Sequence, residues 1–262
     1  MNQWGWYYDQ TRCVSCKACT VACKAWNDDL RGDVNINVSL GWLTSTTDPY
    51  ANPSAYENLP GSDGRQNYSL YAKYHMKEFW RRVTKTEYGA LPPNVDLLST
   101  SIGCNHCNTP ACIPVCPMQI IYKEPTYGIV LVDNTNCISC GKCQDACPWG
   151  SPQFYDPNFR SYTQADPARP KMTKCTLCID RISAGLKPAC VAGCINRALD
   201  AGPISLLQQR YPNWAPFTTI INFPSDSVPS LGINTGPNII FKPRSLMAGV
   251  SSGQGSIQND TN

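Results

Sequence analysis

The sequence predicts an α+β fold in which two similar cysteine-rich modules carry long loops and are followed by an extended C-terminal tail. Three observations predict this fold. All sixteen cysteines fall into four groups of four, and one cysteine-bearing segment occurs twice. The 262 residues include 18 glycines and 22 prolines, and 42% are hydrophobic. The ordinary core is therefore small for this length, and the cysteines are needed to hold the loops.

The four cysteine groups have closely related spacings. The first and third are spaced C-x2-C-x2-C-x3-C, and the second is spaced C-x2-C-x4-C-x3-C. In the fourth, the middle gap has grown to eleven residues. In chain order the groups are Cys13, Cys16, Cys19 and Cys23; Cys104, Cys107, Cys112 and Cys116; Cys137, Cys140, Cys143 and Cys147; and Cys175, Cys178, Cys190 and Cys194.

Such spacing is typical of [4Fe–4S] ligation. Three cysteines at intervals of three lie on a tight loop that can wrap one corner of an iron–sulfur cube, while the fourth reaches a neighbouring cube. Pro117 and Pro148 follow the last cysteine of the second and third groups, where proline suits the first turn of a short helix. We therefore predict four [4Fe–4S] clusters held by all sixteen cysteines.

Disulfides and zinc are the alternative uses of these cysteines. Sixteen cysteines in 262 residues is about 6%, which is below the density of small disulfide-stapled domains. A four-cysteine zinc site uses paired C-x2-C units and has no use for a third and fourth cysteine in the same run. Neither alternative explains why the sixteen cysteines form four complete groups of four.

An internal repeat sets the expected architecture. Residues 8–23 and 132–147 match at an Asp, a Thr, a Ser, an Ala and all four cysteines. Each copy follows a short β-prone run, Trp6–Tyr8 in one and Ile129–Val132 in the other. A repeat of this kind indicates a duplicated unit.

The duplication divides the chain into modules. Residues 100–149 carry the second and third groups and form an inner ferredoxin-like module of the bacterial 8Fe type. Residues 1–28 and 150–200 carry the first and fourth groups and form an outer, split module, related to the inner one by a pseudo-twofold axis. Residues 29–99 are an insertion with linking strands, and residues 201–262 are a C-terminal helix with a tail that wraps a partner.

The fourth cysteine of each group is expected to ligate the cluster of the paired group, as in two-cluster ferredoxins. The predicted ligand sets are Cys13, Cys16, Cys19 and Cys194; Cys175, Cys178, Cys190 and Cys23; Cys104, Cys107, Cys112 and Cys147; and Cys137, Cys140, Cys143 and Cys116.

Smaller elements can also be predicted. We expect a short helix at Met118–Tyr122, a second helix at Ile204–Arg210, and disorder after about Ala248. Residues 29–72 are rich in Asn, Tyr, Ser, Pro and Gly, and are either a surface insertion or a partner-contacting loop.

Composition and missing motifs exclude several functions. A net charge of +3 is too mild for a nucleic-acid-binding protein. There is no run of eighteen apolar residues, so we expect no transmembrane segment, and we also expect no secretory signal at the N-terminus. The sequence has no P-loop and no G-x-G-x-x-G fingerprint, and its two histidines leave little material for acid–base chemistry. We assign no catalytic residue.

Positive side chains lie close in sequence to the predicted ligands and can raise cluster potentials, although simple solvation is the alternative role for each. They are Lys17, Lys24, Lys142, Lys174, Arg181 and Arg197. His106 lies inside a C-x2-C loop. Three roles are open for it: an exposed residue at the rim of the loop, a group whose protonation shifts the cluster potential, or a ligand in place of a cysteine.

Several segments carry a family resemblance. They are Cys104-Asn105-His106-Cys107, Pro110-Ala111-Cys112, Met172-Thr173-Lys174-Cys175 and Pro237-Asn238-Ile239-Ile240. Through these and the cysteine groups, residues 4–28, 76–87 and 100–245 resemble the four-cluster iron–sulfur subunit of dimethyl sulfoxide reductase and polysulfide reductase, which are molybdopterin oxidoreductases. Proline follows the last cysteine in only two groups, and residues 29–72 match no part of the family pattern.

The resemblance implies partners and a location. It implies a large molybdopterin-containing catalytic subunit, a membrane subunit that reacts with quinone, and a relay of electrons between them through this protein. It also implies a peripheral position on the extracytoplasmic face, reached by co-export with a signal-bearing partner; a cytoplasmic location is the alternative. A free soluble polyferredoxin and a zinc-stapled scaffold are the competing functions.

Overall fold

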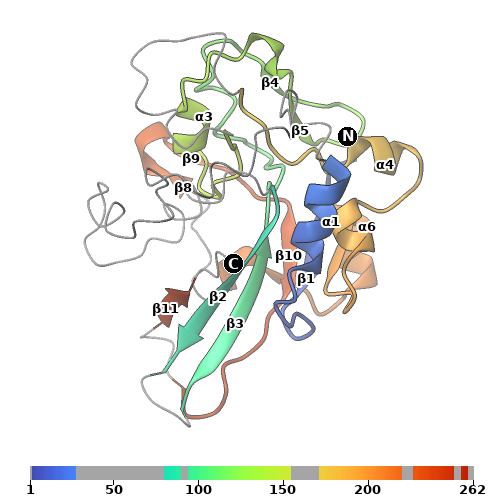
Figure 1. The fold of residues 1–262 in the computed structure, drawn as a ribbon, viewed down its shortest axis with the longest axis vertical. Coiled ribbons are helices and arrows are strands. Elements are labelled where there is room, and N and C mark those ends of the chain that lie inside the picture. The colour runs from blue at the N-terminus through green and yellow to red at the C-terminus, as the bar shows by residue number, and fades with distance from the viewer. Residues whose placement is uncertain are drawn as a thin grey trace, which may run out of the picture.

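The computed structural model describes residues 2–27, 80–89, 94–154, 171–219, 227–250 and 255–258 (Figure 1). All sixteen cysteines lie within these ranges. The predicted insertion at residues 29–72 lies outside them.

A four-stranded sheet organises the first and last parts of the chain. Its strands are β1 (Trp4–Asp9), β6 (Leu199–Pro203), β7 (Ala215–Pro216) and β10 (Ile239–Lys242), in the order β6-β1-β10-β7. Strand β1 pairs antiparallel with β6 and parallel with β10. The predicted β-prone run Trp6–Tyr8 is confirmed, and its aromatic side chains supply much of the core that this short sheet buries.

Close packing between β1 and β10 requires a glycine in β1. A Cβ atom at Gly5 would lie 2.2 Å from the Asn238 carbonyl oxygen and 2.5 Å from Cδ1 of Ile204. Only a residue without a side chain allows the two strands to approach at this point.

A second, two-stranded sheet lies between the second and third cysteine groups. It pairs β4 (Ile121–Lys123) antiparallel with β5 (Val130–Val132), which confirms the second β-prone run. The helix predicted at Met118–Tyr122 is wrong, because Met118 is in a turn and Ile121 begins β4. A five-residue segment is too short to form a stable helix alone, and pairing with β5 buries Ile121.

The two sheets place the cysteine groups in the same relation. Tyr8 of β1 faces Leu199 of β6, and Val132 of β5 faces Ile121 of β4. Tyr8 lies five residues before Cys13 (13 − 8) and Val132 five before Cys137 (137 − 132). Leu199 lies five residues after Cys194 (199 − 194) and Ile121 five after Cys116 (121 − 116). Each sheet therefore aligns the start of one cysteine group with the end of another.

The helices are short and lie at the cysteine groups and at the end of β6. They are α1 (Ala18–Asn27), α3 (Lys142–Asp145), α4 (Ile179–Ser183), α5 (Ala189–Ala192) and α6 (Ile204–Arg210), with 3-10 turns at η5 (Asn134–Asn136), η7 (Phe217–Thr219) and η8 (Pro229–Leu231). Helix α6 has the predicted bounds. None of the helices in the described residues is long and apolar enough to cross a membrane.

Strands β2 (Arg82–Tyr88) and β3 (Asp96–Ile102) form a long antiparallel ribbon that extends away from β4 and β5 (Figure 1). A short pair joins β8 (Ser227–Val228) to β9 (Ile233–Asn234). Strand β11 (Gly255–Gln258) pairs with β2. The prediction of disorder after Ala248 is therefore wrong for residues 255–258, because the free edge of β2 offers them backbone hydrogen bonds.

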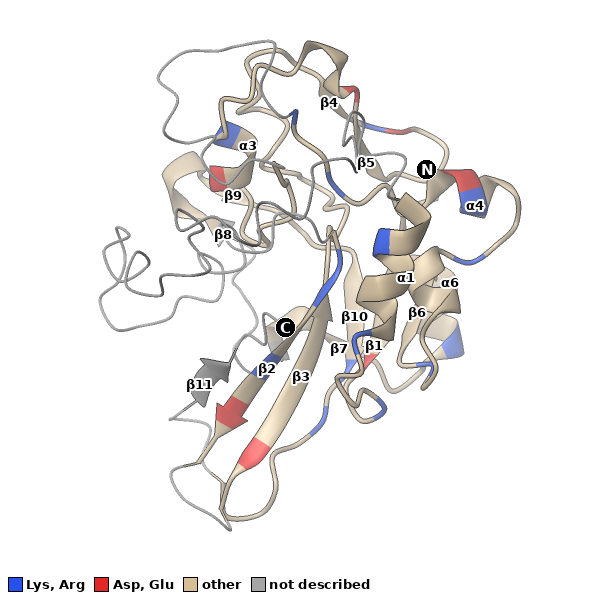
Figure 2. Cartoon of the chain, in the orientation of Figure 1, with Lys and Arg blue, Asp and Glu red and all other residues tan. Residues whose placement is uncertain are grey.

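Lys and Arg residues are spread over α1, α3, α4, α6 and β2 rather than gathered on one element (Figure 2).

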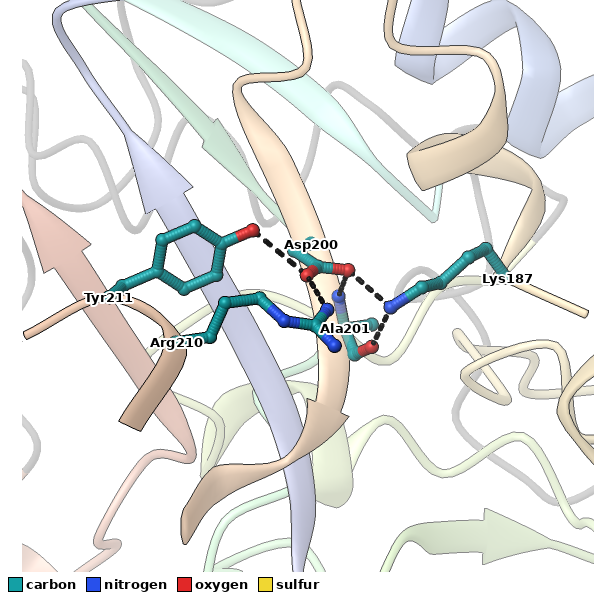
Figure 3. A network of polar contacts seen from close by, with 5 residues as sticks. All are labelled: Lys187, Asp200, Ala201, Arg210 and Tyr211. Carbon is teal, nitrogen blue, oxygen red and sulfur yellow. Dashed lines mark hydrogen bonds and ion pairs between the residues drawn. The ribbon is translucent and has the colours of Figure 1, made fainter. Parts of the chain in front are cut away.

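Asp200 of β6 connects the four-stranded sheet to α6 and to the loop before α5 (Figure 3). Its carboxylate accepts hydrogen bonds from Lys187 Nζ at 2.5 Å, Arg210 Nη1 at 2.9 Å, the Tyr211 hydroxyl at 2.9 Å and the Ala201 N–H at 2.8 Å. Burial alone would raise the pKa of Asp200, but the hydrogen bonds from Lys187 and Ala201 lower it below its ordinary value.

Asp200→Asn should lower the apparent unfolding temperature by about 2–8 °C, because the buried network loses its charge. The folded pKa lies below the unfolded value of 3.8, so the stabilisation is fully present above pH 3.8 and is lost as pH falls through the folded pKa. Thermal unfolding followed by circular dichroism should give the same difference at pH 8 and pH 5.

Arg210→Gln serves as a comparison. Arg210 is 58% exposed in its ion pair with Asp200, so this substitution should lower the unfolding temperature less than Asp200→Asn does. A difference between wild type and Asp200→Asn that already shrinks between pH 8 and pH 5 would contradict the lowered pKa.

Candidate iron–sulfur centres

All sixteen cysteines are free thiols, so none forms a disulfide. Nine are buried, five are partly buried, and only Cys16 and Cys140 are exposed. No three His, Cys, Asp or Glu side chains within the described ranges are grouped around the position of a single ion.

Two cavities separate the cysteines of the inner region into two sets. One cavity is lined by Cys104, Cys107, Cys112 and Cys147. The other is lined by Cys116, Cys137, Cys140 and Cys143. Each cavity thus joins three cysteines of one group to the last cysteine of the other. This is the crossed arrangement expected from the sequence; iron ligation by these thiols stays a prediction.

Electrostatic coupling links the cysteines of the outer region. Burial, opposed by Arg81 and reinforced by the neighbouring thiolates of Cys23 and Cys178, raises the pKa of Cys190 to about 12. Burial also raises the pKa of Cys13, which is coupled to Cys19 and Cys194. The first and fourth groups are therefore close in space, with Cys23 beside the fourth group and Cys194 beside the first.

The four C-x2-C loops share one backbone feature. In each, the residue two positions after the first cysteine has a positive φ: 58° at Ser15, 43° at His106, 55° at Ser139 and 54° at Leu177. None of these is glycine, so each loop carries some strain. The turn directs backbone N–H groups at sulfur, as at Leu177 N to Cys175 Sγ (3.3 Å) and Ser139 N to Cys137 Sγ (3.4 Å).

A second type of N–H donor follows the last cysteine of a group. The backbone N–H four residues later donates to sulfur at Cys147, from Ser151 at 3.4 Å, and at Cys194, from Ala198 at 3.2 Å. N–H groups directed at ligand sulfur raise the reduction potential of an iron–sulfur cluster.

At the first cysteine group, the side-chain amide of Asn27 is the N–H donor to sulfur. Helix α1 continues past Cys23, and Cys19, Cys23 and Asn27 lie buried on one helical face at intervals of four. The Asn27 amide lies 3.8 Å from Cys23 Sγ and 4.0 Å from Cys178 Sγ. It therefore contacts two sulfurs of the same predicted ligand set.

Buried cations provide a test of whether the site fits an anionic cofactor. Arg81 is 1% exposed, stacks 4.1 Å from the Trp6 ring centroid and donates to Ser101 Oγ at 3.2 Å. Burial acts to lower the pKa of Arg81, but the thiolates of Cys190 and Cys175 outweigh burial and raise it.

Lys174 is 2% exposed, and its Nζ lies 3.8 Å from Cys104 Sγ. In the described part of the chain, neither Lys174 nor Arg81 forms an ion pair with a carboxylate. Buried charges are costly unless they are compensated. An oxidised [4Fe–4S] cluster with four thiolates, at about −2, would compensate them, so the residues fit the cofactor.

His106 is fully buried, which excludes one of its three predicted alternatives, the exposed rim residue. Its Nδ1 accepts the Val130 N–H at 3.1 Å. Burial and the nearby charge of Lys174 lower its pKa well below the ordinary value, so the imidazole is neutral.

The six predicted cations lie in different environments. Lys174 is buried, Lys142 and Arg197 are exposed, and Arg181 lies 4.2 Å from the Trp26 ring centroid.

Two residues beside the cysteines, Arg81 and Asn27, were not predicted from the sequence. The four-residue spacing from Cys23 could have indicated Asn27, because it places both on one helical face. Arg81 is more than twenty residues from any cysteine, so no local signal marks it.

Comparison with known proteins identifies the family. The protein is 32% identical over 242 residues to one chain of the anaerobic dimethyl sulfoxide reductase of Escherichia coli, covering 92% of this sequence and 89% of that one. The chain is a member of that family of iron–sulfur subunits. The family comprises [4Fe–4S] electron-transfer subunits of oxidoreductase complexes, and this protein is such a non-catalytic subunit.

Other relatives agree with this assignment. A sulfite dehydrogenase subunit from Allochromatium vinosum is 33% identical over 74% of this chain and 66% of its own length. The iron–sulfur subunit of the nitrate-inducible formate dehydrogenase from E. coli is 32% identical over 77% of this chain and 56% of its own length. A 4Fe–4S dicluster domain matches residues 95–204, which include the last three cysteine groups.

Asn27→Leu should lower the reduction potential of one cluster, because the sulfurs of Cys23 and Cys178 lose an N–H donor. Redox titration followed by electron paramagnetic resonance should show one midpoint moved to a more negative value and the others unchanged. Asn136→Leu is the matched control, since Asn136 is exposed and adjacent to Cys137. Unchanged midpoints in a fully iron-loaded Asn27→Leu protein would contradict a role at sulfur.

Proposed function

We propose that this chain relays electrons through four [4Fe–4S] clusters between a molybdopterin-containing catalytic subunit and a membrane subunit that reacts with quinone. The single observation that carries the proposal is the division of the inner cysteines between two cavities, each lined by four thiols. The same crossed division is proposed for the outer cysteines, which gives four ligand sets and uses every cysteine.

The equal strand registers support two ferredoxin-like modules related by a pseudo-twofold axis. Strand β1 before the first group pairs with β6 after the fourth, and β5 before the third pairs with β4 after the second, at the same five-residue offsets. In both cases this pairing supports a crossed set, in which the last cysteine of one group joins the first three of the other.

Couplings between sets suggest a single row. Thiols of different sets interact electrostatically, which indicates that the sets are neighbours. The interacting pairs are Cys190 with Cys19, Cys175 with Cys104, and Cys143 with Cys147. The sets would then follow one another from the set of Cys13, through that of Cys175 and that of Cys104, to that of Cys137. Such a row has two ends, as a relay between two partners requires.

Each protein group has a defined part in this function. The clusters, when bound, supply reversible one-electron chemistry. The thiolates would hold them, the backbone N–H groups and Asn27 stabilise charge on sulfur, and burial of most ligands excludes water. Arg81 and Lys174 supply fixed positive charge inside the protein.

Membership of the family supports a proposal for the partners and the location. The electron-transfer role is that of a subunit, so a catalytic chain at one end and a membrane chain at the other are proposed to exchange electrons with this protein. A peripheral position on the extracytoplasmic face, after export with the catalytic partner, is proposed with them.

The complex purified under anaerobic conditions should contain about sixteen non-haem irons for this chain, four for each predicted set. Dithionite reduction should produce [4Fe–4S] signals in electron paramagnetic resonance, and a large molybdopterin-containing chain should co-purify. A colourless preparation that contains zinc would contradict the proposal. A brown protein that runs as a monomer with no partner would instead support a free polyferredoxin.

Substitutions can test the crossed ligand sets. Cys112→Ser and Cys147→Ser should alter the same cluster signal, because both thiols line one cavity. Cys143→Ser should alter a different signal, although Cys143 and Cys147 belong to the same sequence group. If Cys147→Ser and Cys143→Ser alter one signal and Cys112→Ser another, the sets are not crossed.

A further inference from the structure

Lys174 lies where the two cysteine regions meet. It precedes Cys175 of the fourth group, and its Nζ donates to the Cys175 carbonyl oxygen at 3.0 Å. The same Nζ lies 3.8 Å from Cys104 Sγ of the second group and donates to the Val130 carbonyl oxygen of β5. The three N–H groups of the ammonium thus have three acceptors, one from the fourth group and two from the inner region.

The position is enclosed and holds a fixed charge. Lys174 is 2% exposed, and its side chain lines the cavity formed by Cys104, Cys107, Cys112 and Cys147. The nearby charged or titratable side chains are Arg81 and the neutral His106, in addition to the thiols. In the described residues no carboxylate pairs with this ammonium, so the thiols, once they ligate a cluster, would be the anionic groups beside it.

We propose that Lys174 sets the reduction potential of the cluster held by Cys104, Cys107, Cys112 and Cys147, at the junction between the two modules. The inference rests on the proposed function, since it requires a cluster in that set. Lys174 acts through the ligand sulfur and is a positioning residue: its two carbonyl contacts hold the ammonium in place. One-electron reduction adds a negative charge to the cluster, and a fixed cation in a medium of low dielectric constant stabilises that charge.

A matched pair of lysines allows a direct test. Lys174 and Lys142 each precede a predicted ligand, Cys175 and Cys143, but Lys142 is exposed. Lys174→Met removes the charge and keeps an unbranched side chain, and Lys142→Met makes the same change in solvent. Both variants are prepared in the complex, and their iron content and midpoints are measured by redox titration with electron paramagnetic resonance.

The expected result is a full iron content in both variants, with one midpoint moved to a lower potential in Lys174→Met alone. Unchanged midpoints in iron-loaded Lys174→Met, or an equal shift in Lys142→Met, would overturn the inference. If Lys174→Met loses iron, Lys174→Arg decides, because it keeps the charge. A wild-type midpoint in Lys174→Arg supports the inference, and a lowered one overturns it.

The wild-type protein separates this inference from the proposed function. A wild-type complex without four cluster signals would overturn the proposed function itself. Four normal signals in the wild type, together with no shift in Lys174→Met, would overturn only the role of Lys174.

Discussion

The structure depends on holding the end of one cysteine group beside the start of another. A [4Fe–4S] cluster requires four thiols around one small volume, and no single loop of this chain places all four there. The β1–β6 and β4–β5 pairs meet this requirement, because their registers set a five-residue distance on each side. The two short sheets therefore position the cysteine loops in addition to forming core.

The same arrangement explains the unusual polar interior. Arg81, Arg82 and Lys174 are almost completely buried in a chain whose hydrophobic content is only 42%. In an ordinary core such charges would destabilise the fold. Beside thiols that would hold an anionic cofactor, Arg81 and Lys174 balance charge, and the aromatic ring of Trp6 covers the guanidinium of Arg81.

Sequence reasoning worked where the signal was local or repeated. The four groups, the two β-prone runs and helix Ile204–Arg210 could be predicted, because spacing and periodicity are properties of neighbouring residues. The helix at Met118–Tyr122 was wrong, and the sequence left the position of His106 open, since pairing with β5 and burial against Val130 are tertiary effects. The parallel pairing of β1 with β10 and the position of Arg81 join residues far apart in sequence, and no local pattern indicates them.

The cysteines of the proposed outer module lie in two separate stretches of the chain, and this separation affects the biogenesis of the protein. The inner cysteines span only residues 104–147, so their sets can be completed by a short stretch of nascent polypeptide. The proposed outer sets need Cys23 with Cys175 and Cys13 with Cys194, pairs that are 152 (175 − 23) and 181 (194 − 13) residues apart in the sequence. The entropic cost of closing so long a loop is larger, although it grows only logarithmically with length. With the proposed sets, the inner cysteines are all synthesised before the outer sets can be completed, which requires translation to have passed Cys194.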